Sequence, residues 1–310
     1  MSPVWIIALV ILVGTYAAWR VRYGPRPAGP RVLCFHKVTR RFCLEGTWTT
    51  PARFEAALDA VERAGFRWVD ETEYRKRNRC LSDDHDAVRR GALCASETSS
   101  AVERDTRIVW LTFDDAYEDV YRYAFPILRR RGIPFHLFVV SGYAGRDNTW
   151  EIGFGRPAHR HATWEQLAEM VRGGATVGSH TETHADLTRA LPCTLRNELV
   201  RSRETIEEML GCAVRTLSYP FGRSDRRVRL AAAAAGYDAA FSLYPGRRNA
   251  VADPMALRRD AVYVIDPAFL VPWKLGTGPL AVFEEMKCRA IHSVAALTPL
   301  VTSRRQRGPG

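Results

Sequence analysis

A short apolar run that ends in two adjacent carboxylates constrains the fold more than any other part of this chain. Residues 108–111 read Ile-Val-Trp-Leu, which is typical of a buried strand, and Thr-Phe-Asp-Asp follows. In α/β folds, reactive groups gather at the carboxyl ends of such strands. Because neighbouring carboxylates repel, we expect a metal on one and a free base in the other. The alternative is that Asp114 and Asp115 only cap the following helix.

A second strand end supports the metal interpretation. Residues 173–179 form a small apolar run, and His180 and His184 follow it with a spacing of four residues. This spacing places both imidazoles on one ion when the backbone makes a helical turn or a loop of equal reach. With Asp115 they make a predicted site of two histidines and one carboxylate, with positions left open for water and substrate. Two solvated loop histidines are the alternative.

Three motifs in this order resemble those of the polysaccharide deacetylase family, the NodB-homology domain of carbohydrate esterase family 4. They are Thr-Phe-Asp-Asp at 112–115, Ser-His-x-x-x-His at 179–184 and Ser-Tyr-Pro-Phe-Gly at 218–222. The resemblance implies an α/β fold, a distorted (β/α) barrel over residues 31–265. It also implies a metal-dependent N-deacetylase site at the strand ends, with Asp115, His180 and His184 as metal ligands and Asp114 as the catalytic base.

The resemblance also implies a catalytic acid. Phe35-His36-Lys37-Val38 matches the aromatic-His-x-Val stretch of the poly-N-acetylglucosamine deacetylase branch, in which this histidine protonates the leaving amine. The chain has no late Leu-x-His motif to supply that acid. Without the resemblance, a hydrogen-bonded structural role for His36 is the more common outcome. We therefore expect His36 to be the acid.

The third motif implies contacts to the substrate. The backbone N–H of Phe221 would help to hold the oxyanion, with Tyr219 and Pro220 beside it. The family arginine that orients the base is replaced here by Ser218, and we expect Arg259 to take over that function. Zinc suits a site of two imidazoles and one carboxylate best, and cobalt, nickel, manganese and iron remain possible cofactors.

The first 22 residues predict a transmembrane anchor. Residues 2–19 carry no charged side chain, which is just long enough to span a bilayer. A cleaved signal and a buried helix are the alternatives. Arginines at 20, 22, 26 and 31 follow the apolar stretch, so the positive-inside rule places the catalytic domain in the cytoplasm, with a periplasmic or extracellular location as the alternative. The seven cysteines show no paired spacing and predict reduced thiols.

The 310 residues fit one barrel with appendages. A Pro/Gly linker at 23–30 precedes the domain, a polar insertion lies near 75–106, and 266–310 form an extension with a basic tail. We expect His136 to be a core or wall residue rather than a ligand. For Trp150 we expect packing, with a place in a sugar subsite as the alternative, and we assign no role to His159 or His161.

The net charge of +11 predicts an anionic partner or surface. Nucleic acid would suit this charge, but the chain has no nucleic-acid motif. The expected partners are therefore the membrane and an N-acetylated, or N-formylated, sugar on a glycan or a lipid carrier. Two alternatives remain open. One is an exported deacetylase that acts on exopolysaccharide or peptidoglycan, and the other is a catalytically inactive, membrane-anchored glycan-binding protein.

Overall fold

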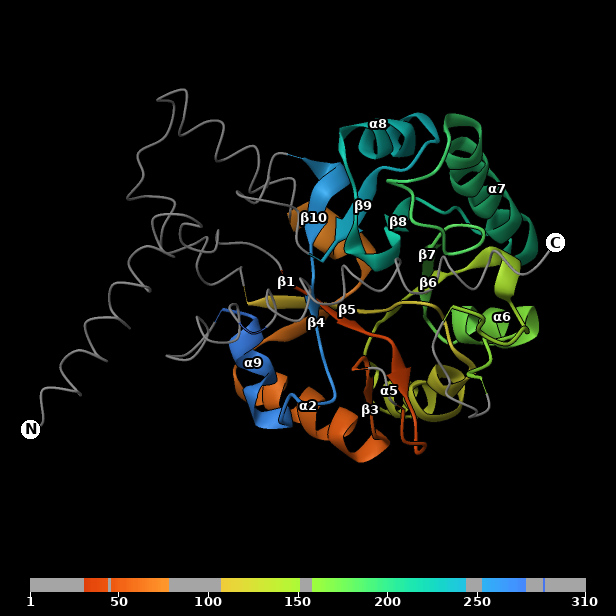
Figure 1. Cartoon of the computed structure of the whole chain (residues 1–310). Coiled ribbons are helices and arrows are strands. Elements are labelled where there is room, and N and C mark those ends of the chain that lie inside the picture. The colour runs from red at the N-terminus through yellow and green to blue at the C-terminus, as the bar shows by residue number, and fades with distance from the viewer. Residues whose placement is uncertain are drawn as a thin grey trace, which may run out of the picture.

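Parallel strands occupy the centre of the computed structural model and helices surround them (Figure 1). The structure describes residues 31–43, 46–77, 107–150, 158–243, 253–276 and 287. The main sheet contains β1 (Arg31–Phe35), β4 (Arg67–Val69), β5 (Ile108–Phe113), β6 (His136–Val139), β7 (Thr176–Ser179), β8 (Thr216–Ser218), β9 (Ala239–Ser242), β10 (Leu257–Arg258) and β11 (Asp260–Ala261). The strand order is β10-β9-β8-β7-β6-β5-β1-β11, with β4 paired to β5. Every pairing is parallel, so the carboxyl ends of the strands share one edge.

A single segment at residues 257–261 joins the two edges of this sheet. Its first half, β10, pairs with β9 through Leu257 and Phe241, and its second half, β11, pairs with β1 through Asp260 and Leu33. Arg259 lies between the two halves, and its backbone N–H donates to Ser242 O at 3.2 Å. The sheet therefore nearly closes on itself, and the predicted α/β class with a distorted parallel barrel is confirmed.

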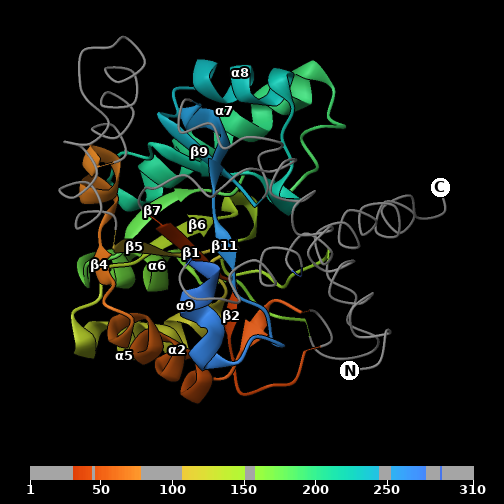
Figure 2. The same ribbon diagram turned by 90° about the vertical axis from the view of Figure 1, so that its left-hand side faces the viewer.

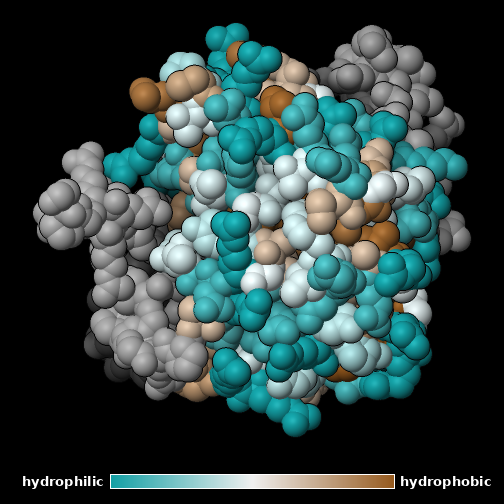
Figure 3. Space-filling model, turned by 90° about the vertical axis from the view of Figure 1, so that its right-hand side faces the viewer, coloured by the Kyte–Doolittle hydropathy of each residue, from teal (hydrophilic) through white to brown (hydrophobic). Residues whose placement is uncertain are grey.

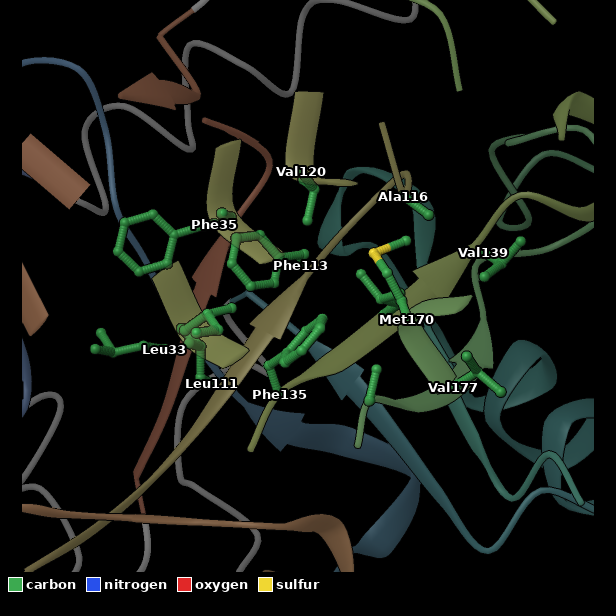
Figure 4. Packing of buried hydrophobic residues seen from close by; sticks show 14 of the residues in the cluster. Leu33, Phe35, Leu111, Phe113, Ala116, Val120, Phe135, Val139, Met170 and Val177 are labelled. Carbon is green, nitrogen blue, oxygen red and sulfur yellow. The ribbon is translucent and has the colours of Figure 1, made fainter. Parts of the chain in front are cut away.

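The strands are apolar on both faces because helices cover the outside and side chains fill the inside. All six residues of β5 are buried, as expected for a parallel strand. Leu33, Phe35, Leu111 and Phe113 belong to the large outer core (Figure 4). The alternate residues belong to a second cluster inside the barrel, which includes Val32, Trp110, Phe138 and Phe241. The period-2 alternation of strands thus separates a helix-facing layer from a barrel interior.

The helices follow local sequence signals. They are α2 (Pro51–Arg63), α5 (Phe125–Arg131), α6 (Trp164–Arg172), α7 (Pro192–Leu210), α8 (Arg226–Ala234) and α9 (Val271–Lys274). Thr50 caps α2 by accepting from Arg53 N, and Thr163 forms a capping box with Gln166 at α6. Figure 2 shows α7 and α8 at one end of the sheet and α2, α5 and α9 at the other.

Prolines lie in the first turn of two helices. Helix α7 begins at Pro192, because a proline is well suited to the first turn of a helix. A π-helical turn, η1 (Val120–Ala124), directly precedes α5, and Pro126 lies in the first turn of α5.

The remaining short elements complete the surface. They are β2 (Lys37–Val38) and β3 (Trp48–Thr49), which pair with each other, and the 3₁₀ turns η2 (Ser141–Tyr143), η3 (Pro220–Gly222), η4 (Pro254–Ala256) and η5 (Ala268–Leu270). Elements η5 and α9 pack against α2, and Leu275 belongs to the outer core. The core thus continues past the domain boundary predicted at residue 265. On the face shown in Figure 3, hydrophilic residues dominate and hydrophobic ones are scattered.

Several predicted segments fall outside the described residues. These are the anchor at 1–22, the linker at 23–30, most of the extension and tail, and residues 78–106 of the polar insertion. The insertion was expected to begin near Arg75, but residues 71–77 form a helical segment. Within the described ranges, no helix has both the length and the apolar character needed to cross a membrane.

Candidate active site

The two adjacent aspartates at the end of β5 point to different partners. Asp115 and Ala116 both adopt left-handed backbone conformations, with φ of 66° and 48°. Such values are uncommon outside glycine, and each costs of the order of 1 kcal/mol. The sharp turn separates the two carboxylates: Asp114 faces Arg259, whereas Asp115 faces the histidine pair. Because both carboxylates have these partners, the alternative that they only cap the following helix is not needed to explain their positions.

Asp115, His180 and His184 converge on one point. The Nε2 atoms of His180 and His184 each lie 3.6 Å from Asp115 Oδ1, and all three side chains are buried. Tetrahedral ligands with metal bonds of about 2.0–2.1 Å are separated by about 3.3 Å, which is close to this spacing. The sequence prediction that these residues lie together is therefore met by the geometry, and the set suits a divalent ion.

The protonation state of His180 also suits a metal ligand. Its Nδ1 lies 2.7 Å from the carbonyl oxygen of Ser218, which can only accept, so Nδ1 carries the proton and Nε2 is a lone-pair donor. Burial lowers the pKa of both His180 and His184, which keeps the imidazoles neutral. The lone pair of His180 Nε2, the Asp115 carboxylate and the Nε2 atom of His184 converge, so the donor set fits the divalent cation that the family resemblance implies.

A buried glutamate shapes the loop between the two histidines. Glu198 on α7 accepts from the backbone N–H groups of Glu182 at 3.0 Å and Thr183 at 2.9 Å, and from the Thr183 hydroxyl at 2.5 Å. The loop includes left-handed backbone at Thr181 and His184, with φ of 70° and 59°. Glu198 therefore satisfies the donors of a strained loop that brings His184 back beside His180.

Arg259 clamps Asp114 from the closing segment of the barrel. Its Nη1 donates to Asp114 Oδ1 at 2.6 Å, and its Nη2 donates to Asp114 Oδ2 at 2.7 Å. The same Nη2 donates to the hydroxyl of Ser218 at 2.7 Å. Burial alone would raise the pKa of Asp114, but the charge of Arg259 outweighs burial and holds that pKa well below its usual range. Arg259 thus lies where a residue that orients the base must lie.

His36 lies beside Asp114, and its side chain is 15% exposed. It follows β1, and its Nε2 is 3.9 Å from Asp114 Oδ2, which is too long for a hydrogen bond. Burial lowers the pKa of His36 to about 4, although the charge of Asp114 opposes this shift. The imidazole is therefore neutral at pH 7 in this structure. An acid role requires His36 to gain a proton before it can donate one.

The third motif divides into a residue at the site and a residue in the core. Phe221 has left-handed backbone, with φ of 59°, and its ring packs edge to face against His184 at 4.8 Å between centroids. Tyr219 is fully buried: its hydroxyl donates to Met255 O and its N–H donates to Phe241 O. These hydrogen bonds give the side chain and the N–H of Tyr219 partners in the core, and its contact with substrate stays a prediction. Pro220 is also buried and has no N–H to offer.

A family model described as polysaccharide deacetylase matches residues 101–240, which include Asp114, Asp115, His180 and His184. Residues 101–240 of this chain are a polysaccharide deacetylase domain. His36 and Arg259 lie outside the matched residues of that domain, although the fold brings both to Asp114.

Curated relatives agree with this family. YxkH of Bacillus subtilis (strain 168), which is assigned to the polysaccharide deacetylases, is 28% identical over 181 residues, or 58% of this chain. The poly-beta-1,6-N-acetyl-D-glucosamine N-deacetylase of Staphylococcus aureus (strain N315) is 27% identical over 126 residues, or 37% of this chain. The match spans 58% of the length of YxkH and 41% of the length of the staphylococcal protein.

Solved structures share the fold of the deacetylase domain. IcaB from Ammonifex degensii superposes with a TM-score of 0.59 at 24% identity, over 80% of this chain and 97% of that protein. The Streptococcus pyogenes deacetylase PplD, in complex with acetate, gives a TM-score of 0.59 at 22% identity, over 80% of this chain and 98% of PplD. At these identities the likeness establishes a common fold.

Two further side chains lie beside the candidate metal ligands of the deacetylase domain. From the sequence we assign no role to His161, and we expect Trp150 near substrate only as an alternative to packing. Trp150 stacks on His184, with 4.3 Å between ring centroids and 11° between planes. His161 is 2% exposed, and its Nδ1 lies 2.7 Å from the carbonyl oxygen of Asp115. Ala162 N donates to Ala116 O at 2.9 Å, so residues 161 and 162 together hold the left-handed turn. The prediction for His136 is confirmed, because it is fully buried in the core.

Proposed function

We propose that this chain is a metal-dependent carbohydrate N-deacetylase, which hydrolyses the acetamide group of N-acetylated amino sugars in a glycan. The observation that carries the proposal is the convergence of Asp115, His180 and His184 beside Asp114, whose carboxylate Arg259 holds in a fixed orientation. The printed name of the staphylococcal relative, a poly-beta-1,6-N-acetyl-D-glucosamine N-deacetylase, supports this substrate class.

Amide hydrolysis requires an activated water, a place for negative charge and a proton for the departing amine. A divalent cation held by Asp115, His180 and His184 would polarise the amide carbonyl and acidify a water molecule. Zinc is the first choice for two imidazoles and one carboxylate, and the donor set also accepts cobalt, nickel, manganese or iron. The buried, neutral imidazoles need not lose a proton to bind such an ion.

Asp114 would accept the proton of the attacking water. Arg259 keeps the carboxylate ionised and fixes the plane of its oxygens, which leaves lone pairs for the water. The same charge makes Asp114 a weak base, so a proton taken up there is readily released. His36, which is neutral and 3.9 Å away, would receive a proton and deliver it to the leaving amine.

Phe221 would complete the site. Its left-handed backbone places the turn after β8 against His184, and a backbone N–H at this turn would donate to the oxyanion of the tetrahedral intermediate. Such a donor acts without reorganisation, because η3 fixes the turn. Removing one oxyanion donor typically lowers kcat by about 10²–10³-fold.

The membrane part of the proposal rests on the sequence. The uncharged stretch at 2–19 and the net charge of +11 favour an enzyme that works beside an anionic membrane surface. We therefore include N-acetylated sugars on a lipid carrier among the candidate substrates, with the domain on the cytoplasmic side. A glycan outside the cytoplasm would place the same chemistry in an exported enzyme.

The test is acetate release by the full chain. Protein stripped with a chelator and reloaded with zinc would be incubated with β-1,6-linked and β-1,4-linked N-acetylglucosamine oligosaccharides and with a lipid-linked N-acetylated sugar. We expect acetate from wild type and from Asp59→Asn, an exposed aspartate on α2, and none from Asp114→Asn. Equal release by Asp114→Asn, or no release from any substrate by folded, zinc-loaded protein, would contradict the proposal.

A further inference from the structure

A cysteine, a histidine and an aspartate form a second cluster away from the candidate metal ligands. Cys43 Sγ lies 3.1 Å from His159 Nε2, and His159 Nδ1 lies 3.0 Å from Asp119 Oδ2. The three residues come from three segments: the loop after β2, the stretch before α6 and the residue that precedes η1. The deacetylase chemistry proposed above uses none of them.

The hydrogen-bonding pattern fixes the roles within this cluster. A carboxylate only accepts hydrogen bonds, so His159 Nδ1 carries the proton that faces Asp119. His159 Nε2 is then left as an acceptor 3.1 Å from Cys43 Sγ, closer than the carbonyl oxygen of Arg41, to which the thiol can also donate at 3.6 Å. Asp119 does not cap η1 with its side chain, so its carboxylate remains available to the imidazole. Nucleophile, base and orienting acid are thus in the order used by cysteine hydrolases.

The backbone holds His159 in place. Asn148 N donates to His159 O at 2.8 Å, and two residues later His161 N donates to Arg146 O at 2.9 Å. The ring of Tyr117 packs edge to face against the His159 ring at 6.0 Å between centroids. The imidazole is therefore fixed before any reagent arrives, which is what proton transfer from the thiol requires.

Access restricts the class of substrate. Cys43 is 4% exposed, although its neighbour Phe42 is 60% exposed at the surface. The side chains of His159 and Asp119 are 11% and 17% exposed. A peptide or a glycan cannot reach a sulfur so enclosed, whereas a small electrophile can. The chemistry that suits such a thiol is oxidation by a hydroperoxide or alkylation by a small reagent.

We propose that Cys43, His159 and Asp119 form a reactive thiol site that is oxidised by hydrogen peroxide to a sulfenic acid. The Cys43 proton passes to His159 Nε2, and the thiolate attacks one peroxide oxygen. An S–O bond forms as the O–O bond breaks, so sulfur loses two electrons and peroxide gains them. The departing hydroxide takes the proton from His159 and leaves as water. The net change is thiol plus peroxide to sulfenic acid plus water.

Labelling of the intact chain tests the site. Each cysteine would be followed by peptide mass spectrometry during reaction with iodoacetamide at pH 6 and pH 7, and during reaction with hydrogen peroxide in the presence of dimedone, which traps sulfenic acids. Cys193 is exposed and serves as the internal reference. We expect Cys43 to react faster than Cys193 at pH 6 in spite of its burial, and to form the dimedone adduct.

Substitution of His159 or Asp119 tests whether Cys43 is labelled because its thiol is activated or only because it is exposed. His159→Gln and Asp119→Asn should slow the labelling of Cys43 by about 10-fold or more, because the thiol loses its base or its orienting group, while Cys193 is unchanged. A merely loosened loop would instead speed the labelling of Cys43. The proposal is overturned if Cys43 in wild type is slower than Cys193 at pH 6, or if the variants label Cys43 as fast as wild type. The wild-type comparison decides the question even where a variant does not fold.

Discussion

Arg259 holds both carboxylate oxygens of Asp114 although 145 positions separate the two residues in the chain. The guanidinium lies above the rings that fill the barrel, 5.2 Å from the centroid of Phe138 and 5.9 Å from that of Phe241. The pair is completely buried, so each charge depends on the other. The orientation of the candidate base therefore depends on the last strands of the barrel.

Arg259→Lys should reduce acetate release by about 10²-fold or more, because a lysine keeps the charge but cannot donate to both oxygens in one plane. Arg259→Ala should also lower the free energy of unfolding by about 3–5 kcal/mol, since it leaves the Asp114 carboxylate buried without its partner. Steady-state kinetics and urea unfolding check both effects. Arg258→Lys, one residue earlier, is the control and should retain activity. Full activity of Arg259→Lys would exclude an orienting role.

Metal removal should lower both stability and activity. A chelator should take zinc from the wild type, and zinc at 100 times its Kd should then restore about 2.7 kcal/mol of stability. His184→Ala should abolish stoichiometric zinc after dialysis, whereas His159→Gln should keep it, because His159 is not in the cluster with Asp115. Elemental analysis and thermal unfolding measure this. Equal zinc content in His184→Ala and wild type would contradict the assigned ligands.

Glu198→Ala should weaken zinc binding without touching a ligand. The substitution removes the acceptor for two backbone N–H groups and one hydroxyl in the loop between the histidines, at a cost of about 1–3 kcal/mol. We expect weaker zinc affinity and a lower Tm, measured by competition with a chromophoric chelator and by calorimetry. Glu204→Ala, on the exposed side of α7, is the matched control. Unchanged affinity would show that the loop holds its shape without Glu198.

Stability should fall in mild acid in part because of His136. Its nitrogens lie 2.7 Å and 3.0 Å from the hydroxyls of Thr176 and Thr216, and burial lowers its pKa to about 3. The unfolded chain takes up this proton near pH 6.5, whereas the folded chain does not until about pH 3. Stability from this source is therefore complete above pH 6.5 and is lost as the pH falls towards 3.

The loss from His136 between pH 7 and pH 5 should be about 2 kcal/mol. Urea unfolding in the presence of a chelator at the two pH values measures it, and His136→Gln should reduce the difference by that amount while the other histidines contribute equally to both proteins. A pH dependence identical in wild type and variant would assign the acid sensitivity to other groups.

The sequence predicted those parts of the site that depend on local pattern. Asp114 and Asp115 follow one apolar strand, and His180 and His184 follow another, so parallel pairing was enough to bring them to a common edge. The barrel was predictable from the resemblance and from the alternation of apolar strands with capped helices. The functions of these residues stay predictions, as does the anchor at 1–22, which lies outside the described residues.

The sequence could not predict contacts that depend on distant segments. His159 and His161 lie in a polar stretch without periodicity, and their partners are residues 43, 115 and 119. No spacing rule connects these positions, because the register of the stretch before α6 against the turn after β5 decides them. The stacking of Trp150 on His184 could not be predicted for the same reason, since only the folded loop brings the two rings together.

The closing segment at 257–261 leaves the candidate site incomplete until the barrel has closed. A ribosome releases this segment after residues 114, 115, 180 and 184, so a nascent chain can already contain both aspartates and both histidines while Asp114 has no arginine partner. Until those five residues dock between β9 and β1, the carboxylate of Asp114 is neither oriented nor shielded from water. The carboxylate of Asp114 is therefore oriented only once the barrel has closed.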